Sequence, residues 1–179
     1  VPDERARAGL FLAMQYPAEI PGVPMADFIR TAHTSLGRKK KSQTAFRKTL
    51  EKELKATGLD PVFAARYLNE GFSGGEKKRS ELVQARMLEP RFAIFDEIDS
   101  GLDIDALKAV AQGINELRRA GTGVLIITHY RRILDHLQPD QVHIMSEGRI
   151  VRSAPGLQLA DALEKGGYEA VLQQEGALS

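Results

Sequence analysis

Two short apolar runs restrict the fold of this chain more than any other feature. Residues 92–95 read Phe-Ala-Ile-Phe, and residues 123–128 read Gly-Val-Leu-Ile-Ile-Thr. Runs of this length and composition are typical of strands that are buried on both faces of a parallel sheet. The sequence therefore predicts an α/β fold in which a partial parallel sheet is flanked by helices.

Polar residues follow both runs. Asp96 and Glu97 come directly after the first run, and His129 comes directly after the second. Because open α/β sheets place their ligands at the carboxyl ends of the strands, we expect these three side chains at one edge of the sheet. Asp96 can hold a hydrated Mg²⁺, and Glu97, pointing the other way across the pleat, can orient an attacking water. This pattern favours phosphoryl-transfer chemistry.

A helix start that suits phosphate lies upstream of the first run. Ser73 and Glu76 have the spacing of a capping box, which predicts a helix from Gly74 to about Met87. The glycines at 74 and 75 each destabilise a helix by ~1 kcal/mol relative to alanine, so their presence calls for a reason. Bare amides, a serine hydroxyl and the helix dipole together suit a phosphate. A purely structural cap is the alternative, and the two glycines favour the phosphate site over it.

These pieces, with others in the same order along the chain, resemble the motifs of the ATP-binding-cassette (ABC) ATPases. Residues 72–76 (Phe-Ser-Gly-Gly-Glu) are similar to the signature motif and residues 93–97 (Ala-Ile-Phe-Asp-Glu) to the Walker B strand. The resemblance extends to the D-loop at residues 100–103, the switch histidine at Thr128-His129, and the Q-loop at Gln15, which precedes Tyr16-Pro17.

The resemblance implies a role for each of these residues. ABC ATPases bind ATP at a dimer interface, where the phosphate loop of one subunit faces the signature helix of the other. By this likeness Glu97 would polarise the attacking water and His129 would touch the γ-phosphate. Gln15 would ligate both the metal and the water, and Asp96 would hold the Mg²⁺. The ATP held by a neighbouring subunit would be capped by Ser73, Gly74, Gly75 and Glu76, with Asp103 connecting the two sites.

Longer segments resemble the SufC type of ABC ATPase, which serves the SUF system of iron–sulfur cluster assembly. The matching segments are residues 71–79, 99–108, 128–134 and 148–151. This resemblance implies SUF scaffold subunits of the SufB and SufD kind as partners and a self-dimer formed on ATP binding. It implies neither nucleic acid as a partner nor direct membrane insertion.

Two other functions stay open. The chain could be the nucleotide-binding subunit of an ABC membrane transporter, which would copurify with permeases and not with cysteine-bearing scaffold proteins. It could also be a non-hydrolysing adaptor that lacks the phosphate loop. The joint presence of Gln15, Glu97 and His129 speaks against the adaptor, which has no need of all three.

The chain departs from the family in one respect. No glycine-rich loop ends in Gly-Lys-Ser/Thr, and residues 37–42 (Gly-Arg-Lys-Lys-Lys-Ser) have neither the spacing nor a preceding apolar strand. In the family this Walker A loop precedes the Q-loop, whereas this sequence starts at Val1. We therefore expect a C-terminal part of a longer cassette ATPase, inactive alone and without useful affinity for ATP.

The motifs and the periodicity predict an order of subdomains along the chain. We expect the end of the core ATPase subdomain, with its Q-loop, at residues 1–16, a helical subdomain at 17–71, the core α/β subdomain at 72–152 and C-terminal helices at 153–179. Within the helical subdomain we expect a proline-rich loop without regular structure at 17–24 and helices at 26–36, 44–57 and 62–68. Asp103 should cap an amphipathic helix whose apolar face holds Ile104, Leu107, Val110, Ala111, Ile114 and Leu117.

Composition sets wider limits. The 179 residues include 25 Lys plus Arg and 24 Asp plus Glu, so no charge excess points to nucleic acid or an acidic surface. The basic run Arg38–Lys41 is expected to be a solvated loop. Cysteine is absent, which fits a reducing, cytoplasmic location and means that any iron–sulfur cluster must be ligated by partners. No apolar stretch approaches the ~20 residues that cross a bilayer.

Overall fold

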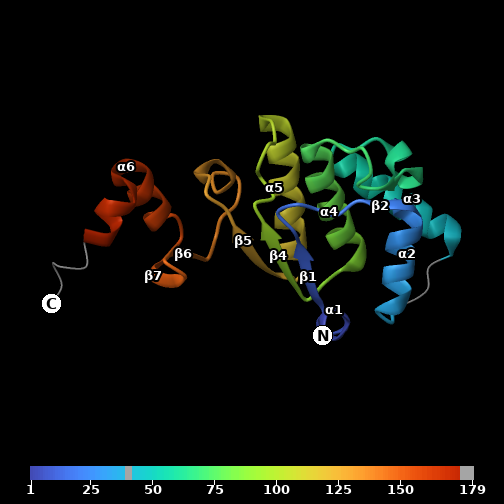
Figure 1. The fold of residues 1–179 in the computed structure, drawn as a ribbon, viewed down its shortest axis with the longest axis horizontal. Helices are drawn as coiled ribbons and strands as arrows, with labels where there is room; N and C mark the ends of the chain where they lie inside the picture. Colours follow the sequence, from blue (N-terminus) through green and yellow to red (C-terminus); the bar gives the residue numbers. More distant parts are fainter. Residues whose placement is uncertain (39–41, 174–179) are drawn as a thin grey trace. The chain divides into compact units, whose positions relative to one another are not determined.

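A computed structural model describes residues 1–38 and 42–173, which form two compact units, Val1–His129 and Tyr130–Ser179 (Figure 1). Of the basic run, Arg38 is described and residues 39–41 lie outside the described residues. None of the helices in the described ranges is long and apolar enough to cross a membrane.

The first unit is built on a parallel sheet with the strand order β1-β4-β5. The strands are β1 (Leu10–Ala13), β4 (Phe92–Asp96) and β5 (Gly123–Ile127), and a short helix, α1 (Pro2–Arg7), precedes β1. Each residue of β4 from Phe92 to Phe95 pairs with one in β1 and one in β5, and Asp96 pairs with Ile127. All three strands therefore end at the same edge, which confirms the predicted partial parallel sheet.

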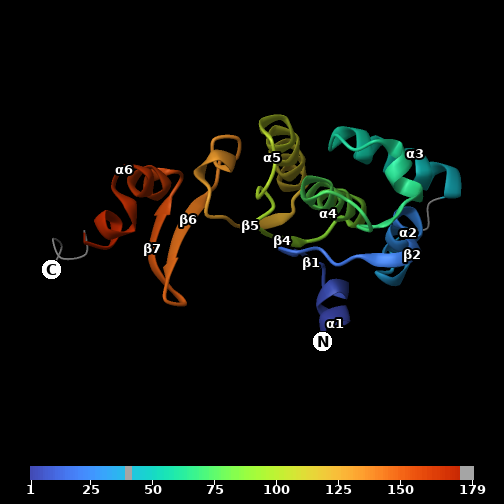
Figure 2. The same cartoon turned by 45° about the horizontal axis from the view of Figure 1, so that its top comes forward.

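Helices cover one face of this sheet. Figure 2 shows α4 (Gly74–Leu88) and α5 (Ile104–Arg119) on the same side of the three strands. The face beneath them carries Ala13, Ala93 and Phe95, all of which are buried. Burial of this face anchors the sheet to the two helices that frame the candidate site.

The opposite face of the sheet is open in the described part of the chain. Because side chains alternate along a strand and paired residues point the same way, Leu12, Phe92, Leu125 and Ile127 share this face. Their exposed fractions lie between 41% and 50%. The expectation that β4 and β5 are buried on both faces is therefore wrong for this structure, because the described helices pack on only one side.

Helix α5 begins as the sequence predicts. The Asp103 carboxylate accepts a hydrogen bond from the Ala106 N–H at 2.8 Å and caps the helix. The predicted apolar face is buried from Leu107 to Leu117, but Ile104 is 68% exposed. Ile104 is the first residue of the helix and lies at its end, outside the packed length.

The segment between β1 and α4 is mainly helical. It holds α2 (Met25–Ser35), α3 (Gln43–Ala56) and a 3₁₀ turn, η1 (Pro61–Ala65). Their apolar stripes meet the inner side of α4 in one core of buried residues, which includes Met25, Ile29, Phe46, Leu50, Leu54, Phe63, Val83 and Met87. The helices predicted at 26–36 and 44–57 are thus confirmed with shifts of one residue.

Two local expectations in this segment are wrong. Residues 20–24 form a strand, β2 (Ile20–Pro24), which pairs antiparallel with β3 (Tyr67–Leu68). The register of this pair shifts between Ile20 and Pro24. The predicted helix at 62–68 is replaced by η1 and β3. Proline is tolerated in this two-stranded ribbon because each strand is an edge strand and needs no complete ladder of N–H donors.

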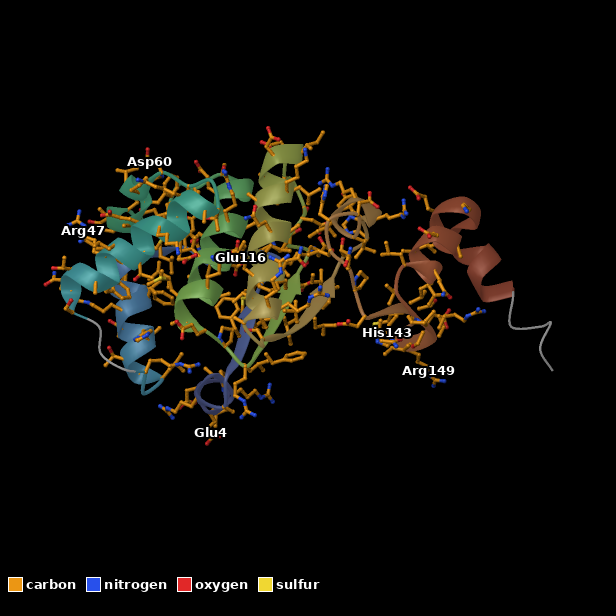
Figure 3. The ribbon with its side chains drawn as sticks, turned by 180° about the vertical axis from the view of Figure 1, so that it is seen from behind. Glu4, Arg47, Asp60, Glu116, His143 and Arg149 are labelled. Atoms are coloured by element: carbon orange, nitrogen blue, oxygen red, sulfur yellow. The ribbon has the colours of Figure 1, made fainter. Side chains whose placement is uncertain are left out.

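The side chain of Arg86, which is 12% exposed, joins the helices. Arg86 of α4 forms ion pairs with Glu53 of α3 at 2.5 Å and Glu116 of α5 at 2.6 Å, and it donates to the Gly113 carbonyl at 3.2 Å. Figure 3 labels Glu116 where α5 runs beside α4. The pairing joins the helical segment to the helices that pack on the sheet.

The second unit contains a hairpin and a helix. After a short 3₁₀ turn, η2 (Arg131–Ile133), strands β6 (Gln141–Ser146) and β7 (Arg149–Pro155) pair antiparallel, and α6 (Gln158–Gln173) follows. Residues 140–145 and 149–152, joined by Ser146-Glu147-Gly148, have the sequence pattern of such a hairpin. Arg131 holds α6 through ion pairs with Asp161 and Glu164 at 2.5 and 2.6 Å.

We predict that two truncations on the same face of α5 differ widely in stability. Leu107 is 3% exposed, so Leu107→Ala should lower the free energy of unfolding by about 2–5 kcal/mol. Ile104→Ala, at an exposed position, should change it by less than about 1 kcal/mol. Urea unfolding followed by circular dichroism measures both. Equal losses for the two variants would contradict the observed end of the packed face.

Candidate functional site

Three side chains meet at the carboxyl edge of the parallel sheet. The Glu97 carboxylate accepts a hydrogen bond from Gln15 Nε2 at 2.9 Å through Oε2. Its other oxygen, Oε1, lies 3.5 Å from His129 Nδ1. Glu97 is therefore held between one residue that follows β1 and one that follows β5, as the parallel order of the strands requires. The structure brings these three predicted residues together, and their roles stay predictions.

Glu97 leaves the strand through an unusual backbone conformation. Its φ is +48°, in the left-handed region that L-residues other than glycine rarely adopt. Its N–H donates to the Ile127 carbonyl at 2.8 Å, and its own carbonyl accepts from the Ser100 N–H at 3.1 Å. The turn, and not the pleat alternation that the sequence suggested, directs the Glu97 side chain. Such a conformation costs about 1–3 kcal/mol and tends to occur at functional sites.

Asp96 and Gln15 offer oxygen ligands at the same edge. Asp96 is the last residue of β4 and belongs to the open face, since residues two apart along a strand, here Phe92, Ile94 and Asp96, point the same way. Gln15 donates through Nε2, which leaves its side-chain oxygen as a possible ligand. Among the described residues, no group of three or more His, Asp or Glu gathers around a metal position. Because Mg²⁺ usually takes one or two carboxylates together with waters and phosphate, this pair fits an ion that arrives with a nucleotide.

The tip of α4 is a well-made helix start that faces outward. The Glu76 N–H donates to Ser73 Oγ at 3.3 Å, and the Ser73 N–H donates to Glu76 Oε2 at 2.7 Å, so the predicted capping box is confirmed. The hydrogen bond from the Ser73 backbone lowers the pKa of Glu76. Ser73 and Gly74 are exposed. Since the cap already uses the Glu76 carboxylate, any contribution of Glu76 to phosphate binding would be to fix the tip.

The two glycines of the tip have different surroundings. A Cβ at Gly74 would meet no atom within 4 Å, whereas a Cβ at Gly75 would lie 3.3 Å from Leu102 Cδ2. Gly75 thus has a packing reason, because the loop before α5 lies against it. Gly74 has none among the described residues, and the interpretation that a ligand approaches there stays a prediction. Asp103 follows that same loop and caps α5.

Comparison with known proteins supplies the family. No family model matches the sequence. Vegetative protein 296 of Bacillus subtilis (strain 168) is 53% identical over 176 residues, covering 97% of this chain and 67% of that protein. A probable ABC transporter ATP-binding protein of Streptococcus pyogenes serotype M3 is 54% identical over the same length. The chain belongs to the ABC ATP-binding cassette family. It spans about two thirds of the length of these relatives.

Solved structures agree with this assignment at the level of the fold. An ATP-binding subunit of an ABC transporter superimposes with a TM-score of 0.74 at 24% identity, over 97% of this cassette and 70% of that chain. The dimeric cassette MJ0796 bound to ADP and Pi gives a TM-score of 0.73 at 19% identity, over 86% and 65% of the two chains. The cassette fold is thus shown by structure as well as by sequence.

Two buried charged residues of the cassette contact the main chain at the site in a way that the sequence did not predict. Lys78 and Glu81 lie on the inner side of α4 and are 5% and 7% exposed. Lys78 Nζ donates to the carbonyls of Met14, Gln15 and Asp96 at 3.0, 2.7 and 3.2 Å. Glu81 Oε1 accepts from the Met14 N–H at 3.0 Å. Opposite charges three residues apart on a helix that faces a sheet edge were the signal available in the sequence.

From the sequence, one of the lysines that follow the cap, Lys77 or Lys78, could pair with Glu97 at rest, but the structure shows other partners for both. Lys77 Nζ contacts the exposed Glu19 at 2.7 Å, and Lys78 contacts main-chain carbonyls. Within the described residues no ion pair joins either lysine to Glu97, whose carboxylate is shared by Gln15 and His129.

A further buried acid braces the loop that carries Glu97. Asp99 is fully buried, and its Oδ2 accepts from Thr128 Oγ1 at 2.9 Å. Thr128 directly precedes His129, so this bond joins the loop after β4 to the end of β5. This bond limits how far Glu97 and His129 can move apart.

We predict that Glu81 makes stability depend on pH. Burial raises the pKa of the Glu81 carboxyl from 4.5 to about 7. The folded state therefore binds a proton that the unfolded state releases, so stability from this group is present below pH ~4.5 and is lost as pH rises through ~7. Replacement by Gln removes this dependence. The free energy of unfolding of wild type minus that of Glu81→Gln should fall by up to about 3 kcal/mol from pH 5 to pH 8.

Urea titrations at four pH values between 5 and 8 give these differences. Glu19→Gln removes an exposed carboxylate of the same unit and should keep the wild-type slope. If wild type and Glu81→Gln show parallel pH dependence, the buried carboxyl is not the titrating group.

Proposed function

We propose that this cassette is the larger part of a subunit that binds Mg²⁺·ATP and hydrolyses it at a dimer interface. The observation that carries the proposal is the Glu97 carboxylate, held between Gln15 and His129 at a sheet edge. In this proposal Glu97 polarises the attacking water and Gln15 orients it. His129 contacts the γ-phosphate, and Asp96 with Gln15 holds the metal.

In this proposal the exposed tip of α4 contacts the nucleotide that a second subunit holds. Gly74 presents its main-chain amide and Ser73 its hydroxyl at the positive end of a fifteen-residue helix. Gly74 leaves room for a phosphate. Gly75, Glu76 and Asp103 would act by fixing the tip and the adjoining loop. Two subunits arranged head to tail would then complete two equivalent sites.

In this proposal a phosphate-holding loop is supplied by a segment of a longer parent protein. We propose that the parent carries a Walker A segment that covers the open face of the sheet. The apolar side chains Leu12, Phe92, Leu125 and Ile127 on that face support this proposal, and so does the greater length of the relatives. Asp96 lies at the edge of the same face. We keep the predicted subdomains, 1–16, 17–71, 72–152 and 153–179, as part of the proposal.

We propose further that the parent works in iron–sulfur cluster assembly, with SufB- and SufD-like scaffold subunits as partners. The likeness of residues 71–79 and 99–108 to SufC-type ATPases supports this, and the absence of cysteine is consistent with clusters ligated by partners. A transporter subunit is the second candidate, favoured by the names of relatives such as a probable ATP-dependent transporter of Synechocystis, 48% identical.

Affinity purification of the full-length protein separates these two candidates. A SUF role predicts copurified soluble proteins that contain cysteine and show iron–sulfur absorbance after reconstitution. A transporter role predicts copurified membrane permeases, recovered only from detergent extracts.

We predict that Glu97→Gln in the full-length protein abolishes hydrolysis but not binding. Loss of the carboxylate removes the group that polarises water, so kcat should fall by about 10²–10⁴-fold. The affinity for ATP should change by no more than about 3-fold, since Glu97 does not hold the phosphates. Phosphate release and nucleotide titration measure the two quantities. Glu51→Gln, on the exposed side of α3, is the control and should turn over as wild type. Undiminished hydrolysis by Glu97→Gln would contradict the proposal.

We predict that the 179-residue chain alone binds ATP only weakly, because its sequence contains no Walker A loop to hold the phosphates. Calorimetric titration with Mg²⁺·ATP should give a dissociation constant of about 1 mM or higher. This corresponds to a binding free energy of at most ~4 kcal/mol in magnitude. Micromolar binding would show that this chain holds the phosphates without a Walker A loop.

A further inference from the structure

We propose that Lys78 and Glu81 are positioning residues that couple the tip of α4 to the hydrolytic edge of the same subunit. In this role a nucleotide contacting Ser73 and Gly74 would shift Gln15, and through it Glu97. The inference rests on the function proposed above. It adds a link between two sites of one subunit: the tip of α4, which contacts the partner's nucleotide, and the hydrolytic edge.

One turn of α4 holds the main chain next to Gln15 from both sides. Glu81 accepts from the Met14 N–H, and Lys78 donates to the Met14 carbonyl. Both main-chain polar groups of Met14 thus bond to residues three apart on one helix, which lie on the same helical face. Met14 directly follows β1 and precedes Gln15, so its position determines where the Gln15 side chain starts.

Lys78 also joins this segment to the end of β4. An ammonium group has three N–H donors, and the three carbonyls within reach, those of Met14, Gln15 and Asp96, match that number. Two of them follow β1 and the third ends β4. The lysine therefore sets the spacing between the main chain at Gln15 and the main chain at Asp96, which precedes Glu97.

The burial of Lys78 argues for a role beyond stability. In the described part of the structure no carboxylate pairs directly with this side chain, which is only 5% exposed. Burying a charge without an ion-pair partner costs several kcal/mol before its hydrogen bonds are counted, and an apolar residue of similar volume often packs at least as well. Three directed hydrogen bonds to the edge carrying the candidate catalytic residues give the lysine a use that an apolar residue lacks.

The path from tip to edge is short and continuous. Gly74 and Lys78 are four residues apart, which is about 6 Å along the helix axis. The capping box keeps this first turn intact. From Lys78 the path runs through the Gln15 main chain to the 2.9 Å hydrogen bond between Gln15 and Glu97. Every step is a direct contact, as a physical coupling network requires.

Steady-state ATPase kinetics of the full-length protein test the coupling. Lys78→Met keeps the volume but removes the donors, and it should lower kcat at least 10-fold while the KM for ATP stays within about 3-fold. Lys77→Met, one residue away and paired only with exposed Glu19, is the matched control and should match wild type. Equal kinetics of Lys78→Met and wild type would overturn the proposal.

A second pair of variants separates positioning from charge. Glu81→Gln keeps a side-chain oxygen that can accept from the Met14 N–H, and kcat should stay within about 3-fold of wild type. Glu81→Leu removes the acceptor and should lower kcat at least 10-fold. If the Gln and Leu variants lose activity equally, the hydrogen bond to Met14 is not the functional contact.

Amide hydrogen exchange tests the contacts of Lys78 and Glu81 with the Met14 main chain, here called the clamp, without any need for hydrolysis. In the full-length protein without nucleotide, Glu81→Leu should speed exchange of the Met14 amide at least 10-fold and leave the amides of β4 and β5 within 2-fold of wild type. Exchange raised throughout both strands would show a purely structural role and overturn positioning. If the wild-type full-length protein does not hydrolyse ATP, the proposed function fails, while this exchange result still decides whether the clamp exists.

Discussion

In-register parallel pairing of β1, β4 and β5 is the constraint on which the rest of the structure depends. Because the three strands run the same way, Gln15, Glu97 and His129 all follow strand ends at one edge. Antiparallel pairing would place one of them at the far end of the sheet. The left-handed turn at Glu97 and the Asp99–Thr128 hydrogen bond then bring the side chains into contact.

The packing of α4 on this sheet gives the helix two jobs that would otherwise be separate. Its first turn is exposed and capped, as an anion site needs, while its second turn carries Lys78 and Glu81 into the sheet edge. Arg86 in its last turn fixes α4 to α3 and α5. In the proposed function, one helix would thus connect the tip that contacts a partner's nucleotide with the candidate catalytic residues of its own subunit.

Features that depend on neighbours in the sequence could be predicted, and features that depend on distant pairing could not. The cap at Ser73 and Glu76, the cap at Asp103 and the β6–β7 hairpin follow from local rules. The β2–β3 ribbon joins residues more than forty positions apart. The prolines of β2 favoured a loop at this position in the sequence. The partners of Lys78 could not be predicted, because only the fold shows which face of α4 meets Met14. The open sheet face was missed because an apolar run does not tell which of its sides is covered.

A crystal structure of the full-length protein with Mg²⁺ and a non-hydrolysable ATP analogue tests the central claim most directly. The account predicts that the γ-phosphate lies against Ser73 and Gly74 of one subunit and within hydrogen-bonding reach of Gln15 and His129 of the other. An analogue bound with the tip of α4 facing solvent or the chain's own core, or far from Glu97, would contradict it.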